Sequence, residues 1–520
     1  MSGRSGGIAR SSALGLALLL LAAAMRPGGA VPLAGADGPE KTVLKSGIPC
    51  IYHRDGASPV TVVGLVVPGG KSAVPRGLDG LAAMTARLVL EIPDEGKVRD
   101  LMAQATRMSF VCLEDHSVIL IECLSENLEE ALRVAGKIVQ DPLISGLRVG
   151  RAKELMKLYG RAEEDDAGTV AHNAVLSRYY GGDGYGSALY GTEESLKAIG
   201  RREVVEFFRS RFRAASVFFT VVSDLEAAPV RGLLEKYFSA LPEGGPVVSP
   251  VAVPALPTEK AVRLSRDTTQ TFVGRAYALP APEPGEYAKG VLAEVLIGRG
   301  PGSRLWRLRA DERLAYNVGA NLTWTRGAGI LEVFLETENA KSIRASEALD
   351  REIEGLRTGG IAADELETTK VMAKAGLLRS VEMKSGRARL LSGFEVLGLG
   401  FDHLPRLFAD LDAVGLDDLN AYIRTVLSPE RAVSITVGPD EGQVRERRVP
   451  CPTLARRTSS TSSARSSRAT PGTAPWGSSS TCRASASGTI PIGRPAGTWP
   501  KSGRPGSKKA LLPCLSTTSG

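Results

Sequence analysis

The chain repeats one order of predicted elements on either side of a proline-rich segment. In the first stretch, a strand at Val60–Val67 precedes a helix at Gly77–Leu90, a hairpin and further helices, and a strand at Val217–Val222 closes it. After Pro246–Glu259, a strand at Thr271–Ala278 begins the same order again. Alternating apolar residues indicate strands, and apolar residues three to four apart indicate helices. The sequence therefore predicts an α+β fold of two homologous lobes, each a mostly antiparallel sheet packed by helices on one side.

Changes in composition set the expected domain boundaries. Residues 37–245 form the N-terminal lobe, residues 246–262 a Pro-rich linker of semi-rigid type, and residues 263–445 the C-terminal lobe. From residue 446 the chain is a basic, low-complexity tail, and from Pro450 onward Ser, Thr, Pro, Gly, Ala and Arg dominate and acids are absent. A disordered tail and a frameshifted reading of a GC-rich gene both explain residues 446–520, and the choice stays open.

The formal net charge of +8 does not describe the folded body. Ten Lys or Arg lie in residues 451–520 and three in residues 1–36, with no acid in either stretch. Of the 65 bases and 57 acids, 52 bases and all 57 acids therefore lie in residues 37–450. This mildly acidic balance argues against a nucleic-acid partner.

The N-terminus has the form of a secretory signal peptide. Arg4 and Arg10 precede an apolar run at Ala13–Met25, and small residues follow with candidate cleavage positions after Ala30 and Ala36. The run is short for a membrane span, which needs about 20 apolar residues. We expect residues 1–36 to be removed and the protein to be exported, periplasmic or extracellular, with no stable membrane span afterwards. An uncleaved segment would anchor it to a membrane.

Three further segments carry a family pattern. They are GLDGLAAMTARLVL at Gly77–Leu90, YYGGDGYGSALYGTEESLKAI at Tyr179–Ile199, and LRADERLAYNV at Leu308–Val318. With the duplication, they resemble the insulinase/pitrilysin family of zinc metallopeptidases. In that family the first helix carries the inverted zinc motif H-x-x-E-H. In register, the two histidines fall on Gly80 and Met84 and the glutamate on Ala83. The resemblance therefore implies a degenerate member that has lost the motif.

A third zinc ligand is also missing at its expected place. The resemblance puts a glutamate near Tyr159, with Glu154 and Glu163 close by. A catalytic zinc needs three protein ligands and a water, so a shifted alignment would not restore the site. The four histidines, His53, His116, His172 and His403, lie in unrelated segments without paired spacing. We expect them to be structural or surface residues, and we expect no metal in this chain. The six cysteines show no C-x-x-C, and buried free thiols in the body are favoured over disulfides, which export permits.

The second lobe keeps residues that the resemblance marks as functional. Arg309 and Tyr316 match the family's Arg/Tyr pair, which reaches a zinc site and contacts the substrate carbonyl at the transition state. A guanidinium and a phenol are both donors and suit a forming oxyanion. The alternative is that Arg309 pairs with an acid such as Glu312 and that Tyr316 fills a strand face. Upstream lies a Gly-rich turn expected to bind substrate, made of Gly300, Gly302, Ser303 and Arg304.

The resemblance implies a zinc-free, substrate-binding subunit of a two-subunit metallopeptidase. A zinc-bearing partner of the same family would form the heterodimer and supply H-x-x-E-H, so this chain holds no cofactor and is inactive alone. The expected substrate is an unfolded peptide. The alternative is a non-catalytic structural or peptide-binding protein, as in the family's respiratory-complex core subunits. A self-sufficient enzyme is a third alternative that no motif nominates.

Overall fold

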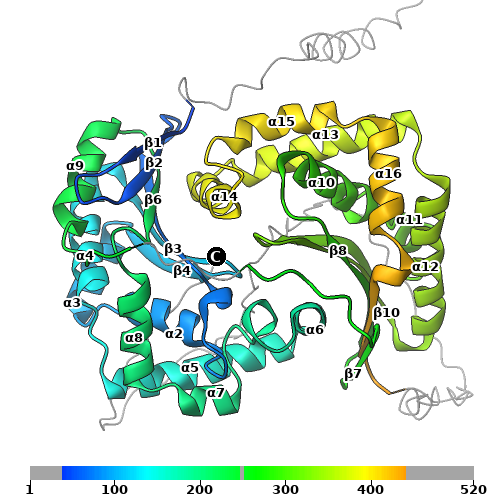
Figure 1. Ribbon diagram of the computed structural model, residues 1–520, viewed down its shortest axis with the longest axis horizontal. Helices are drawn as coiled ribbons and strands as arrows, with labels where there is room; N and C mark the ends of the chain where they lie inside the picture. The colour runs from blue at the N-terminus through cyan, green and yellow to red at the C-terminus, as the bar shows by residue number, and fades with distance from the viewer. Residues whose placement is uncertain (1–37, 246–250, 441–520) are drawn as a thin grey trace, which may run out of the picture. The chain divides into compact units, whose positions relative to one another are not determined.

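The computed structural model describes residues 38–245 and 251–440, all within one compact unit (Figure 1). The predicted signal peptide, the predicted tail and residues 246–250 of the linker lie outside the described residues. The predicted domain boundaries stay predictions. Among the described residues, no helix combines the length and the apolar character that crossing a bilayer requires.

The first half of the chain builds a six-stranded sheet in the order β1-β2-β6-β3-β5-β4. Its neighbours are antiparallel except β2 and β6, which run parallel. The long central strands are rich in β-branched residues, which suit a pleated surface. Their bounds are β1 Glu40–Val43, β2 Pro49–Arg54, β3 Val60–Pro68, β4 Arg107–Cys112, β5 His116–Leu124 and β6 Phe218–Ser223.

The second half builds a five-stranded sheet in the order β7-β11-β8-β10-β9. It repeats the first pattern, because the last strand β11 again lies between a parallel neighbour, β7, and an antiparallel one, β8. Its bounds are β7 Ala261–Ser265, β8 Gln270–Leu279, β9 Asn317–Trp324, β10 Gly329–Glu338 and β11 Ala432–Gly438. Two mixed α/β halves with sheets packed by helices confirm the predicted fold class.

Helices follow the strands in the same order in both halves. Those of the first half are α2 Leu81–Val89, α3 Glu95–Ala103, α4 Leu128–Gln140, α5 Gly146–Glu164, α6 Ala167–Tyr180, α7 Glu193–Ala198, α8 Arg201–Arg211 and α9 Ala227–Phe238. Those of the second half are α10 Pro284–Gly298, α11 Trp306–Ala310, α12 Ser342–Gly359, α13 Ala363–Ser380, α14 Lys384–Leu397, α15 His403–Ala413 and α16 Leu416–Val426.

Each sheet buries one face against helices of its own half. Successive side chains of a strand point to opposite faces, so alternate residues of β3 enter different cores. Val63 and Leu65 pack with α2 and α4, and Val333 of β10 packs in the same way with α10 and α12 of the second half. These two apolar cores are the helix-covered sides that the sequence predicts.

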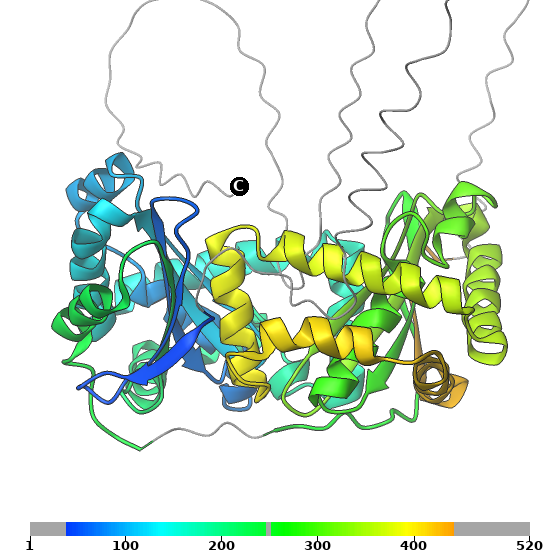
Figure 2. The ribbon, with the colours of Figure 1, turned by 90° about the horizontal axis from the view of Figure 1, so that it is seen from above.

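The opposite face of each sheet is covered by a helix from the other half. Helix α14 packs on β3 and β6, where Ala388 and Leu391 share a buried cluster with Val62 and Val66 (Figures 1 and 2). Helix α6 packs on β8 and β11, and its Val175 lies in a buried cluster with residues of the second sheet. The two halves therefore exchange equivalent helices, which adds a second covered face to the predicted architecture.

Candidate functional site

The three positions of the lost zinc motif lie at the start of α2. Gly80 is the residue before the helix and has the left-handed backbone φ of 90°. Ala83 and Met84 lie in the first turn and are 1% and 0% exposed within the apolar core. The helix predicted at Gly77–Leu90 is therefore confirmed in its C-terminal part, but the first motif position lies outside the helix rather than on its face.

The backbone of the loop at Tyr190 and Gly191 lies directly against Gly80. A Cβ atom added to Gly80 would lie 2.9 Å from the backbone nitrogen of Gly191 and the backbone carbon of Tyr190. The loop is tied down by Ser195, whose hydroxyl donates a hydrogen bond of 2.9 Å to the carbonyl of Asp79. Thr192 in the sequence GTEES is the residue type expected for a helix cap, and it caps α7 with Ser195, rather than Glu194, as its reciprocal partner. A histidine at position 80 would therefore collide with this loop.

Tyr159, at the position expected for the third zinc ligand, contacts the same loop that lies against Gly80. Tyr159 on α5 packs against Tyr190, with ring centroids 5.2 Å apart and ring planes tilted by 52°. One turn later, Glu163 is buried, and burial raises the pKa of its carboxyl while the charges of Lys71 and His172 act against that rise. Glu154 is exposed and pairs with a neighbouring lysine on the same helix. The two acids near Tyr159 thus lie on different sides of α5.

The residues at these positions do not fit a zinc ion. Protein zinc is held by Cys thiolates, His nitrogens and carboxylate oxygens. Here Gly80, Ala83, Met84 and Tyr159 provide none of them. In the part of the chain that the structure describes, no group of three or more His, Cys, Asp or Glu residues is placed to hold a metal ion. No catalytic step can therefore be assigned to a metal held at this helix.

Arg309 is exposed on the short helix α11. Its guanidinium carbon lies 4.9 Å above the ring centroid of Trp306, one turn earlier. Glu312, the acid proposed as a structural partner, instead pairs with Arg351 at 3.1 Å. Among the described residues, Arg309 has no ion pair with an acid. Its charge is held by an aromatic face and remains directed to the surface.

Tyr316 is exposed beside the start of β9. Its side chain is 52% exposed, so it does not fill a buried strand face. Its hydroxyl donates a 3.0 Å hydrogen bond to Glu338, which also accepts one from Lys341. The bond to Glu338 raises the pKa of the Tyr316 phenol, which keeps the phenol protonated and able to donate at neutral pH. Among the described residues, no hydrogen bond or cation–π contact joins Arg309 to Tyr316.

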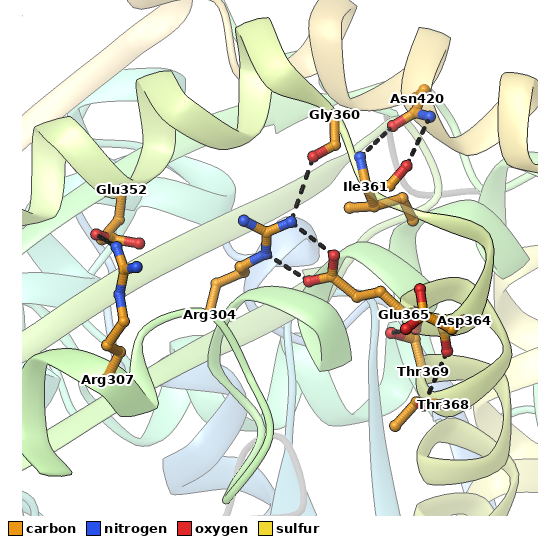
Figure 3. A network of polar contacts seen from close by, with 10 residues as sticks. All are labelled: Arg304, Arg307, Glu352, Gly360, Ile361, Asp364, Glu365, Thr368, Thr369 and Asn420. Carbon is orange, nitrogen blue, oxygen red and sulfur yellow. Dashed lines mark hydrogen bonds and ion pairs between the residues drawn. The ribbon is translucent and has the colours of Figure 1, made fainter. Parts of the chain in front are cut away.

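Two of the four residues predicted to bind substrate in the Gly-rich turn make hydrogen bonds within the molecule. Ser303 is buried, and its hydroxyl donates to the carbonyl of Gly300 at 2.8 Å. Arg304 donates to both carboxylate oxygens of Glu365 on α13, and to the carbonyl of Gly360 (Figure 3). Gly300 and Gly302 have φ values of 78° and 98°, so the turn itself requires glycine there.

The network around Arg304 fixes the helix that carries Arg309. Arg307, also on α11, pairs with the buried carboxylate of Glu352 on α12 (Figure 3). No sequence motif marks Trp306, Glu352 or Glu365. Trp306 and Arg309 are three residues apart, the spacing that brings two side chains together on a helix, and this is the one local signal of their contact.

Comparisons with known proteins point to one family. Residues 198–371 match the family model of the peptidase M16 inactive domain. The chain is 24% identical over 284 residues to the uncharacterized zinc protease YmxG of Bacillus subtilis, covering 54% of this chain and 68% of that protein. It is 19% identical over 421 residues to mitochondrial-processing peptidase subunit beta of Neurospora crassa, covering 78% of this chain and 88% of that protein.

A solved structure shares the fold. The crystal structure of a peptidase M16 inactive domain from Pseudomonas fluorescens aligns with a TM-score of 0.72 at 19% identity, covering 78% of this chain and 98% of that chain. Three findings agree with the family resemblance in the sequence. They are the duplicated halves, the matched segment at residues 198–371, and the absence of zinc ligands at Gly80, Ala83 and Met84. The chain is therefore similar to the insulinase (M16) peptidase family, and its residues 198–371 match the inactive domain of that family.

Proposed function

We propose that this chain is the zinc-free, substrate-binding subunit of a two-subunit metallopeptidase of its family. The observation that carries the proposal is the surface display of Arg309, held over Trp306 without an acid partner among the described residues. A structural arginine would gain stability from a carboxylate, as Arg304 does with Glu365. An arginine kept free of one offers its donors to a ligand.

The chemistry offered by the surface is hydrogen-bond donation. Arg309 supplies guanidinium N–H groups, and Tyr316 supplies a phenol whose raised pKa favours the protonated form. Both groups stabilise negative charge on a peptide carbonyl oxygen when attack on the carbon begins. In the proposed complex, zinc belongs to a partner with an intact H-x-x-E-H motif, and this chain binds and orients an unfolded peptide.

The relatives support an assembly, because one of them is named as a peptidase subunit. The identity of the partner belongs to the proposal. So does the compartment: an exported complex, periplasmic or extracellular, follows from the signal-peptide pattern at residues 1–36. Fractionation of cells that express the chain, with N-terminal sequencing of the recovered protein, tests that part separately.

Reconstitution tests the function. Hydrolysis of an unstructured quenched peptide and bound zinc are measured for the purified chain, for a zinc-bearing family member from the same genome, and for their mixture. We expect no zinc in this chain alone, bound zinc in the partner and in the mixture, and turnover only in the mixture. Arg309→Ala should lower kcat by about 100-fold, the loss typical of a removed oxyanion donor. Arg344→Ala, at an exposed position on α12, is the matched control and should change nothing.

Two results would overturn the proposal. Zinc-dependent turnover by this chain alone would show that the lost motif is not the metal site. An active mixture that tolerates both Arg309→Ala and Tyr316→Phe would leave the second candidate, a non-catalytic structural or peptide-binding protein. The poor fit of Gly80, Ala83 and Met84 to zinc favours that candidate when no partner restores activity.

A further inference from the structure

A cavity of about 280 Å³ lies where the two halves of the chain meet. On the first-half side it is lined by the end of β3 and the start of β6, including Pro68 and Phe218. On the second-half side it is lined by Arg326, between β9 and β10, and by Val396 near the end of α14. Its lining includes neither the Arg/Tyr surface nor the former zinc positions.

Two ion pairs border the cavity, and each joins one half of the chain to the other. Lys41 of β1 lies 2.5 Å from Glu395 of α14. Arg326 of the second half lies 3.0 Å from Asp115 of the first. The charged lining thus holds two cations and two anions. A ligand with one sign of charge would leave an opposite charge unmatched, whereas a molecule with both signs is complementary.

The two pairs differ in how readily a ligand can engage them. Asp115 is 3% exposed and is already held by Arg326 and by the hydroxyl of Tyr185. The side chains of Lys41 and Glu395 are 37% and 20% exposed, and an exposed pair of this kind is worth little and opens easily. The second carboxylate oxygen of Glu395 accepts a 3.1 Å hydrogen bond from the Phe401 backbone, which fixes its orientation.

We propose that this cavity binds a small zwitterion, an α-amino acid with an apolar side chain. Glu395 accepts hydrogen bonds from the ligand ammonium, and Lys41 donates to the ligand carboxylate, while Arg326 contributes a second positive charge to the lining. Phe218 and Val396 contact the side chain. The volume lies at the lower end of ligand pockets, about 300 Å³, which favours a single amino acid over an extended peptide. A ligand that contacts both halves also holds them together.

Titration calorimetry of the full chain without any partner tests this site. The probes are L-leucine, L-leucinamide, which lacks the carboxylate, and N-acetyl-L-leucine, which lacks the ammonium. L-phenylalanine and an unstructured tetrapeptide are measured for comparison. We expect saturable binding of leucine and at least tenfold weaker binding of each blocked form. Lys41→Met should weaken leucine at least tenfold and leave leucinamide unchanged. Glu395→Gln should weaken leucine and leave N-acetyl-leucine unchanged. Lys45→Met, at an exposed position outside the lining, is the control.

Several outcomes would overturn the inference. Binding of neither leucine nor phenylalanine would exclude an amino-acid site. Equal affinity for leucine and its blocked forms would exclude recognition of both charges. A tetrapeptide that binds more tightly than leucine, or leucine binding that ignores both Lys41→Met and Glu395→Gln, would place the ligand elsewhere. Thermal unfolding of each variant verifies that it is folded. Since no peptidase partner takes part, these results are independent of the proposed function.

Discussion

Arg387 of helix α14 donates a hydrogen bond of 2.7 Å to the carboxylate of Asp55, in the loop after β2, and the two side chains are 7% and 3% exposed. Arg387 also donates to the carbonyl of Val381 at 3.2 Å. The pair therefore joins a helix of the second half to the sheet of the first, inside the molecule. Removing one partner of such a pair leaves a buried charge without compensation.

Asp55→Ala should lower the free energy of unfolding by about 3–5 kcal/mol, the typical loss for one member of a buried ion pair. Denaturant unfolding followed by circular dichroism measures it. The control is Glu226→Ala, which breaks the pair with Arg54 whose side chains are 51% and 67% exposed. That change should be worth less than about 1 kcal/mol. Equal losses in the two variants would show that burial of Arg387 carries no penalty.

His53 adds a pH dependence beside this pair. It is 3% exposed, and neither ring nitrogen has a hydrogen-bond partner. Burial, followed by the positive charge of Arg387, lowers its pKa from 6.5 to about 4, although Asp55 acts in the opposite direction. The unfolded chain thus takes up the proton at a higher pH than the folded chain. The contribution to stability is complete above pH 6.5 and is lost as the pH falls toward 4.

His53→Phe should therefore flatten the stability profile between pH 6.5 and 4. One such histidine contributes a slope of at most about 1.4 kcal/mol per pH unit. Urea unfolding at several pH values in this interval measures it. His116, whose pKa burial also lowers to about 4, remains in the variant, so the slope should decrease rather than vanish. A profile identical to that of the unsubstituted chain would contradict the assignment.

Restoring the zinc motif should not restore a zinc site. The triple variant Gly80→His, Ala83→Glu, Met84→His brings the ligand types back, but the first position meets the Tyr190–Gly191 backbone at 2.9 Å and the other two are buried among apolar side chains. We expect a melting temperature well below that of the unsubstituted chain, and no stoichiometric zinc by metal analysis. A folded variant with one bound zinc would show that the loop yields.

Two single substitutions before α2 separate two causes of lost stability: the strain of a left-handed backbone and the collision of a new side chain with the loop at Tyr190 and Gly191. Gly77 and Gly80 have φ values of 77° and 90°, but a Cβ at Gly77 meets no atom within 4 Å. Gly77→Ala should cost about 1 kcal/mol, the usual penalty for a left-handed backbone in a residue with a side chain. Gly80→Ala should cost clearly more in the same denaturant experiment. Equal costs would mean that the loop over Gly80 moves freely.

The sequence predicts the parts of this fold that depend on local pattern. Alternation of apolar residues predicts the central strands, and the residue type of Thr192 and its place before α7 indicate a helix cap. The left-handed backbone at Gly80 and the ion pair of Arg304 with Glu365 were not predicted. Both depend on residues distant in the chain, the Tyr190–Gly191 loop and Glu365, which no local window contains.

The exchange of helices escaped the sequence analysis for a related reason. The apolar residues Ala388 and Leu391 predict a buried face on α14, but a helix period does not say which sheet it will cover. Lys384 and Arg387 on the same helix are buried as well, and Lys384 donates to the backbone carbonyls of Ser58 and Val60 at 2.7 and 2.8 Å. In the sequence, lysine and arginine on a helix predict a face exposed to solvent. The pattern therefore gives no sign that this face of α14 contacts the first sheet.

Trp306 should matter for activity through Arg309. Trp306→Leu removes the aromatic face that holds the guanidinium, and an exposed cation–π contact is worth about 0.5–1 kcal/mol, or roughly two- to fivefold. In the reconstituted pair we expect kcat to fall by that factor with KM nearly unchanged. Trp306→Phe keeps an aromatic face and should recover most of the loss. Equal rates for the leucine and phenylalanine variants would remove Trp306 from the arrangement.

The exchanged helices predict that the halves cannot fold separately. Residues 37–245 alone lack α14, which leaves Val62 and Val66 of the first sheet uncovered, and residues 246–445 alone lack α6. Each half should therefore aggregate when expressed by itself, whereas co-expression should give a soluble complex that unfolds as one unit. Cleavage at a protease site placed within residues 246–259 of the folded chain is the control, because it should leave the halves associated. Cooperative unfolding of either half alone would contradict the prediction and show that its own helices suffice.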